Sequence, residues 1–89
     1  MKAKLVVKTA LDNICNTIYP QSIEGSQIHE ARVKNMYWAY NNGNLRTDAE
    51  LNIKIQNAKE EMIAYRFAND FGIAYKIAES ILKDLEAIA

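Results

Sequence analysis

The chain has 89 residues, of which 49% are hydrophobic and 25% are charged, and eleven Lys or Arg residues balance eleven Asp or Glu residues. This length fits one domain, near the lower limit for a self-sufficient core, and the apolar content is too high for intrinsic disorder. The net charge of zero argues against a basic nucleic-acid coat protein and against an acidic DNA mimic. The charge is uneven, however: residues 1–46 hold six basic and three acidic residues, and residues 47–89 hold five and eight. Such complementarity favours packing within the molecule, or head to tail between copies.

The start of the chain and its cysteine content bear on localisation. Cys15 is the single cysteine, so no internal disulfide forms, and we expect an intracellular, cytoplasmic protein. Two lysines followed by Leu5, Val6 and Val7 are reminiscent of a signal peptide. Because Lys8 and Asp12 interrupt the apolar run and no long apolar stretch follows, we expect neither an export signal nor a membrane span.

Apolar residues at steps of three and four predict a first helix over residues 3–19. Pro20 ends it, because the residue before a proline avoids the helical region of backbone space. Residues 21–26 are interpreted as a linker, and Ser26 as the N-cap of a second helix over 27–41. The turn Asn41-Asn42-Gly43-Asn44 closes that helix, since Asn and Gly tolerate left-handed backbone angles.

The second helix is apolar on two sides. One side carries His29, Val33, Met36 and Tyr40, and the other Ile28, Ala31, Trp38 and Ala39. Such a helix is either central in a bundle or uses one side for a partner. Aromatic side chains dominate interface energetics, so Tyr37 and Trp38 are candidate partner-binding residues; packing in the core is the alternative.

The last half of the chain carries the longest helical pattern. Thr47 and Glu50 have the spacing of a capping box, which starts a helix over 48–70. A further helix follows over 73–88, and Gly72 separates the two stretches. If the chain turns at Gly72, residues 64–83 resemble a generic helix-turn-helix. If the helix runs through, the chain is a plain bundle with a protein partner.

A helix-turn-helix would place its second helix over about residues 76–86, in the major groove of DNA. The candidate DNA-binding residues on its outward side are Tyr75, Lys76, Ser80 and Lys83. Glu79 on the same side and the acidic character of residues 47–89 weaken this interpretation, since DNA affinity comes largely from neutralising phosphates. Ala78 is also smaller than the apolar residue that usually locks the two helices.

Residues with catalytic or metal-binding chemistry are sparse. His29 is the only histidine, and no further ligands stand at a metal-site spacing from it. No strand–turn–Ser context supports a nucleophile, and adjacent Glu60 and Glu61 would point about 100° apart on a helix. The three scattered glycines form no phosphate loop. We therefore expect no catalytic site, metal or cofactor, and a protein that works by binding.

The sequence thus predicts an all-α single domain, residues 1–89, of about four helices. A DNA-binding helix-turn-helix protein is the most specific hypothesis. The alternatives are a protein-interaction module, such as a small inhibitor or adaptor of a phage or mobile element, and a homo-oligomer holding a small charged ligand. A homodimer would enlarge the small core. The predicted core comprises Val7, Leu11, Ile14, Ile18, Val33, Met36, Tyr40, Leu51, Ile55, Met62, Phe67, Phe71, Ile77, Ile81 and Leu85.

Overall fold

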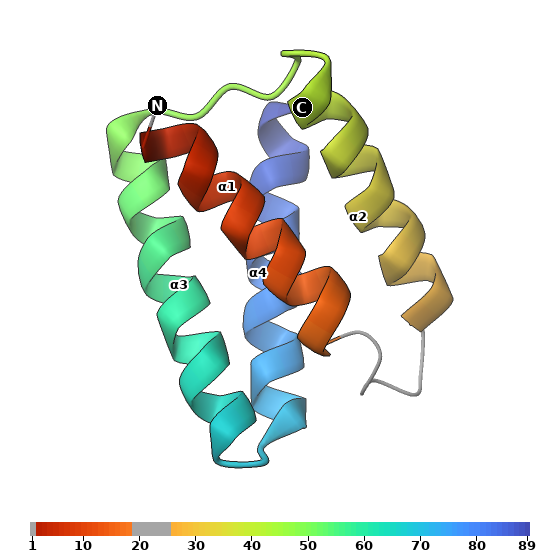
Figure 1. The fold of residues 1–89 in the computed structure, drawn as a ribbon, viewed down its shortest axis with the longest axis vertical. Coiled ribbons are helices and arrows are strands. Elements are labelled where there is room, and N and C mark those ends of the chain that lie inside the picture. Colours follow the sequence, from red (N-terminus) through yellow and green to blue (C-terminus); the bar gives the residue numbers. More distant parts are fainter. Residues whose placement is uncertain (1, 19–25) are drawn as a thin grey trace.

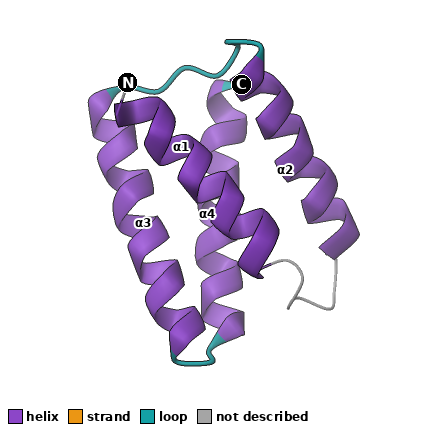
Figure 2. Cartoon of the chain, in the orientation of Figure 1, coloured by secondary structure: helices purple, strands orange, loops and turns teal. Residues whose placement is uncertain are grey.

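The computed structural model describes residues 2–18 and 26–89. These residues form the helices α1 (Lys2–Asn13), α2 (Ser26–Asn41), α3 (Ala49–Phe67) and α4 (Phe71–Ile88), with a π-helical turn, η1 (Ile14–Ile18), after α1; they contain no strand. Successive helices run in opposite directions, and α4 lies behind α1, between α2 and α3 (Figure 1; Figure 2). The predicted all-α bundle of about four helices is therefore confirmed.

The first two predicted helices are present with shifted ends. The α-helical geometry of α1 gives way to the wider π-helical turn η1 at Ile14, so the first element is not one regular helix. Its predicted end at Pro20 and the linker over 21–25 lie outside the described residues. At the end of α2, the Asn44 N–H donates to the Ala39 carbonyl at 2.9 Å, and Gly43 has a left-handed φ of 71°. The predicted turn is confirmed.

The N-cap of α3 is Asp48, so the capping box predicted at Thr47 is wrong. The helix begins at Ala49, one residue later than that box requires, and Asp48 keeps an extended backbone. Its Oδ1 accepts a hydrogen bond from the Leu51 N–H at 2.7 Å. Thr47 Oγ1 accepts instead from Asn52 Nδ2 at 3.0 Å.

The chain turns between α3 and α4, as the predicted helices over 48–70 and 73–88 require, but the turn lies at residues 68–70 and Gly72 falls inside α4. Asn69 adopts the left-handed conformation, with φ of 61°, and the next residue, Asp70, caps α4 by accepting from the Ile73 N–H at 3.2 Å. Asn visits this region more readily than most residues, and Gly72 lies in the first turn of α4. The two helices then run antiparallel side by side (Figure 1). They do not cross steeply as the helices of a helix-turn-helix do.

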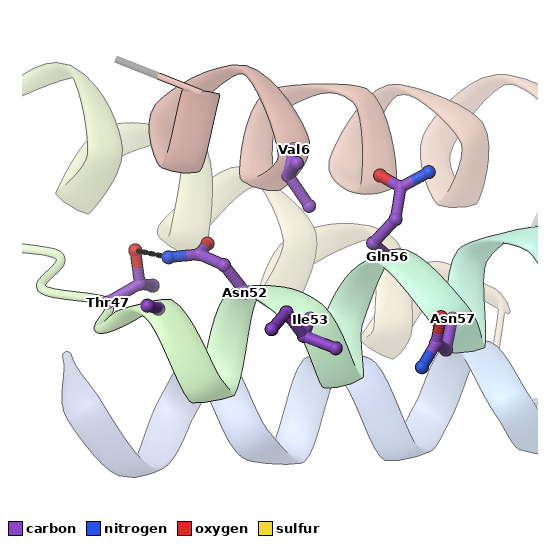
Figure 3. Close-up of a pocket in the computed structure, with 7 residues that line it drawn as sticks. Val6, Thr47, Asn52, Ile53, Gln56 and Asn57 are labelled. Carbon is purple, nitrogen blue, oxygen red and sulfur yellow. Dashed lines mark hydrogen bonds between the residues drawn. The ribbon is translucent and has the colours of Figure 1, made fainter.

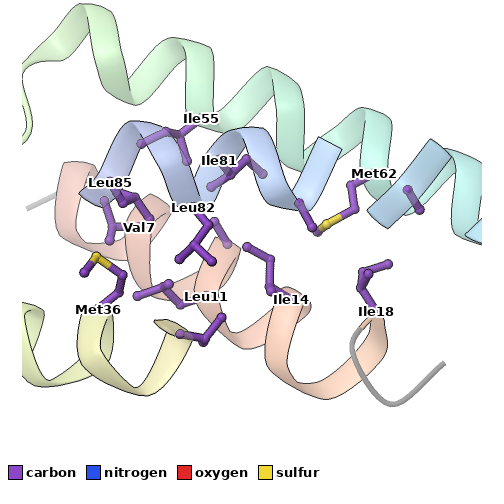
Figure 4. Close-up of a cluster of buried hydrophobic side chains, with 14 residues drawn as sticks. Val7, Leu11, Ile14, Ile18, Met36, Ile55, Met62, Ile81, Leu82 and Leu85 are labelled. Carbon is purple, nitrogen blue, oxygen red and sulfur yellow. The ribbon is translucent and has the colours of Figure 1, made fainter. Parts of the chain in front are cut away.

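Every helix contributes to one core (Figure 4). Ten residues of the predicted core are buried, and Tyr40, Leu51 and Ile77 are half-buried against it. Phe71 is half-buried at the start of α4. The prediction that Phe67 belongs to the core is wrong, because its side chain is 75% exposed. The buried face of α3 runs through Ile55 and Met62, and Phe67 falls outside this face.

The buried face of α4 is also rotated relative to the predicted one. The predicted core residues of this helix were Ile77, Ile81 and Leu85, whereas the buried stripe is Ala74, Ala78, Ile81, Leu82 and Leu85. Two alanines at its centre are fully buried. Because the distance between helix axes depends on the side chains at the contact, these alanines allow a close approach to α4. Ala78 is thus a packing residue, and Ile73 is left partly exposed.

Candidate binding surfaces

A cluster of charged side chains joins α2 to α4, and we call it the Arg32 cluster: His29, Arg32, Glu79 and Glu86. Arg32 donates through Nε to Glu86 Oε2 at 2.8 Å and through a terminal nitrogen to Glu79 Oε1 at 2.6 Å. Its other terminal nitrogen contacts Glu86 Oε1. His29 Nδ1 lies 2.6 Å from Glu79 Oε2. A nitrogen of Arg32 or His29 therefore lies close to each of the four carboxylate oxygens, although Glu79 Oε2 is buried and accepts no hydrogen bond.

The Arg32 cluster is held by charge-assisted hydrogen bonds in a partly dry setting. The hydrogen bond from Arg32 lowers the pKa of Glu86 below its ordinary value and, in return, raises the pKa of Arg32. Tyr75 packs edge-on against His29, with ring centroids 4.9 Å apart, and burial raises the pKa of its phenol. Since both carboxylates bind the guanidinium, the cluster fastens α2 to α4.

The candidate DNA-binding residues divide between two sides of α4. Lys76, Ser80 and Lys83 are exposed and, at steps of four and three, share one face. Tyr75 is half-buried and packs against His29 of α2, so it does not belong to the outward side. Glu79 likewise turns to the Arg32 cluster.

The two candidate partner-binding aromatic residues, Tyr37 and Trp38, lie in different environments. The half-buried Tyr37 hydroxyl donates a hydrogen bond to Asp12 Oδ1 and so ties α2 to α1. Burial, followed by this hydrogen bond, raises the pKa of the phenol. Trp38 is 62% exposed. The predicted aromatic surface is therefore reduced to Trp38.

A groove that the sequence did not predict lies between α1 and the first turns of α3 (Figure 3). We call it the α1–α3 groove. It has a volume of about 490 Å³ and a largely apolar lining that includes Val6, Ala49 and Ile53. Ile53 is 63% exposed although its side chain is large and apolar. Gln56 and Asn57 edge the groove further along α3 (Figure 3).

Asn52 is a buried polar residue in the lining of the α1–α3 groove, and only the nitrogen of its side-chain amide forms hydrogen bonds. The residue is 7% exposed, and its Nδ2 donates to Thr47 Oγ1 at 3.0 Å and to the Asp48 carbonyl at 2.6 Å. Because that carbonyl can only accept, the amide orientation is fixed. Oδ1 is buried and accepts no hydrogen bond from any described residue. The sequence held one signal for this site: a polar residue three positions before the buried Ile55, on the buried face of α3.

Two negative findings apply to residues 2–18 and 26–89. No three His, Cys, Asp or Glu side chains gather there in a way that could hold a metal ion. None of the helices in these ranges combines the length and the apolar character needed to cross a membrane.

The fold and these surfaces define the chain as a small antiparallel four-helix bundle with one apolar groove described. No protein-family model, curated protein or solved structure matches the chain. The functional argument therefore rests on its own residues.

Proposed function

We propose that this chain is a small non-enzymatic protein-interaction module that receives an apolar part of its partner in the α1–α3 groove. The observation that supports this is the groove itself. Its volume of about 490 Å³ lies within the range of about 300–1,000 Å³ typical of ligand sites. An open apolar hollow beside an exposed Ile53 has the character of the pockets that accept interface anchor residues.

The polar side chains at two other contacts between helices bind one another within the chain, which favours the α1–α3 groove as the binding surface. The Arg32 cluster occupies the contact of α2 with α4, and Tyr37 binds Asp12 where α2 meets α1. These polar side chains are used within the chain. The α1–α3 groove leaves apolar area accessible, so a bound molecule gains by covering it.

Site-specific photocrosslinking tests this proposal. A benzophenone side chain at position 53 should form a discrete adduct with the partner in the cells that make the protein. The same probe at Lys54, which is exposed on the neighbouring side of α3, is the matched control and should give none. Equal labelling from both positions, or none from position 53, would overturn the proposal.

DNA binding is a second candidate, favoured by one observation on α4. Glu79 and Glu86 are engaged by Arg32, so the exposed face of this helix presents Lys76 and Lys83 without those two carboxylates. Phosphate contacts would produce binding that weakens steeply with salt. Mixed-sequence DNA should then bind at low salt, and the double variant Lys76→Glu/Lys83→Glu should fail to bind. Absence of binding by the wild type at low salt removes this candidate.

A further inference from the structure

The turn after α2 contains the only Asn-Gly pair of the sequence, Asn42-Gly43, and it lies at one end of the bundle (Figure 1). Both residues are exposed, and a Cβ added at Gly43 would meet no atom within 4 Å. An asparagine before glycine is open to attack by the backbone nitrogen that follows it, because glycine has no side chain to shield that nitrogen. The turn therefore combines a chemically reactive pair with access to water.

Two backbone hydrogen bonds close α2 as a Schellman motif. The Gly43 N–H donates to the Tyr40 carbonyl at 3.2 Å, and the Asn44 N–H donates to the Ala39 carbonyl at 2.9 Å. In this motif the residue after the cap takes the left-handed conformation, and Gly43 has φ of 71°. Asn42 is therefore the C-cap residue of the helix, directly before the glycine that the motif requires.

The folded cap holds both groups that would have to react. Asn42 Nδ2 donates to the Trp38 carbonyl at 2.8 Å, and the Gly43 nitrogen keeps its proton in the bond to Tyr40. Attack of this nitrogen on Asn42 Cγ breaks both bonds, so the reaction proceeds only while the cap is open. Because helix ends open locally at a lower free energy than the whole molecule, the turn reacts from the native state.

We propose that Asn42 is a self-modification site, which loses its amide through a cyclic imide formed with Gly43. The Gly43 nitrogen gives up its proton and bonds to Asn42 Cγ. The bond from Cγ to Nδ2 breaks, and ammonia leaves with that proton. Water then opens the succinimide at either carbonyl, which gives an aspartyl or an isoaspartyl residue at position 42. The step needs only water and neither an oxidant nor a reductant.

Either product weakens the end of α2. A carboxylate cannot donate to the Trp38 carbonyl, and it places a negative charge at the carbonyl end of the helix, where the dipole disfavours anions. An isoaspartyl residue also adds one atom to the main chain between the Asn44 N–H and the Ala39 carbonyl. The modification therefore puts a charge one turn after the exposed Trp38 and loosens the turn that follows it.

Peptide mapping of the full chain, held at mildly alkaline pH, is the first test. Trypsin cuts after Lys34 and Arg46. The peptide between these cuts contains four exposed asparagines: Asn35, Asn41, Asn42 and Asn44. We expect the change of amide to carboxyl at position 42 before any other, as two separable products. The other three asparagines are internal controls, since none precedes glycine, and Asn42→Gln should stay unmodified because its side chain would have to close a larger ring. Reaction first at another asparagine would overturn the site.

The rate in the folded chain tests the role of the cap. Compared with the same chain unfolded in urea, the folded chain should react about five- to thirtyfold more slowly, which corresponds to one or two hydrogen bonds. Slowing by more than about a thousandfold would show that the reaction needs global unfolding, and would overturn reaction from the native state. Equal rates in the two states would show that the cap holds neither group.

Two substitutions at Asn44 form a matched pair for the same question. Asn44→Pro removes the N–H that donates to the Ala39 carbonyl and should speed the reaction at position 42 at least about fivefold. Asn44→Ala keeps that N–H and should leave the rate near the wild-type value. Equal rates in the two variants would overturn the dependence on the cap.

Asn42→Asp copies one product and tests its consequence. Hydrogen exchange of the Gly43 amide should become about fivefold faster, because the side-chain bond to the Trp38 carbonyl is lost. Asn44→Asp adds the same charge but leaves the Asn42 amide in place, and it should change the exchange rate less. Equal exchange in the two variants would overturn the loosening of α2 by the modification.

Discussion

Two contacts between helices place polar side chains in different ways. Where α2 meets α4, the Arg32 cluster supplies a nitrogen contact to every carboxylate oxygen that it contains. Where α1 meets the start of α3, Asn52 uses its donor and leaves its acceptor unpaired beside an apolar hollow. Each contact buries one oxygen that accepts no hydrogen bond, Glu79 Oε2 in the first and Asn52 Oδ1 in the second. The two contacts differ in the accessible apolar area that lies beside the second.

From this difference we infer that the Arg32 cluster serves stability and that the α1–α3 groove serves recognition. A charged group that loses its partner in a partly buried site costs free energy, so substitutions in the Arg32 cluster should lower the free energy of unfolding. The groove is built of exposed apolar atoms whose burial awaits a partner. Substitutions there should change binding and leave folding nearly unchanged. The predictions below test this division, beginning with the largest effect.

Arg32→Met should have the largest effect on stability. It removes the cation and leaves Glu79 and Glu86 near each other. We expect a loss of about 2 kcal/mol, less than the 3–5 kcal/mol for a fully buried pair because the Arg32 side chain keeps about a quarter of its exposure. Urea denaturation followed by circular dichroism measures this loss.

The same substitution has a matched control and a signature in pH. Lys34→Met removes an exposed pair with Glu30, at 3.4 Å, and should cost less than about 0.5 kcal/mol. The pKa of Glu86 is lowered in the folded state, so its contribution is present above the ordinary value of 4.5 and is lost as the pH falls through the folded-state pKa. Arg32→Met should flatten this acidic decline. Equal effects of the two substitutions would contradict the assignment of the Arg32 cluster to stability.

Tyr37→Phe should have an intermediate effect on the free energy of unfolding. It removes the hydrogen bond to Asp12 that joins α2 to α1, at a cost of about 1–2 kcal/mol for a bond to a charged acceptor. The pKa of Tyr37 is raised in the folded state, so its contribution is complete below the ordinary phenol value of 10 and is lost as the pH rises through the folded-state pKa.

Stability measured against pH separates this contribution from the others. Above pH 10 the wild type should lose stability more steeply than Tyr37→Phe. The decline should not vanish in the variant, because burial also raises the pKa of Tyr75. Identical slopes in the two proteins would show that Tyr37 is not held by Asp12 in solution.

The sequence predicted the helices well because their information is local. Apolar spacing marks Val7, Leu11 and Ile14 as one face, whatever they pack against. The exposure of Phe67 and the incomplete burial of Ile77 have a different cause. Which face of α3 or α4 is buried depends on the neighbouring helix, and the pattern favours large residues where the structure uses small ones for close approach.

The candidate surfaces were harder to predict for the same reason. Trp38 is exposed and Tyr37 is held by Asp12, although the two residues are adjacent and equally aromatic. The Arg32 cluster joins residues 47 and 54 positions apart, and no local pattern encodes that pairing. The hydrogen bonds of the Asn52 amide go to Thr47 and Asp48 at the start of α3, which lies one residue from the predicted start.

Ile53→Ser should have the smallest effect on stability and a large effect on binding. Because Ile53 is 63% exposed, it contributes little buried area to the fold, and we expect a change of less than about 0.5 kcal/mol in the free energy of unfolding. Ile55→Ser, two positions away and fully buried, is the contrasting control and should cost more than about 2 kcal/mol. If the groove is a recognition surface, Ile53→Ser should weaken binding of the partner while its urea midpoint stays at the wild-type value. A large fall in that midpoint would mean that the groove side of α3 serves the fold, and the division between the two helix contacts would not hold.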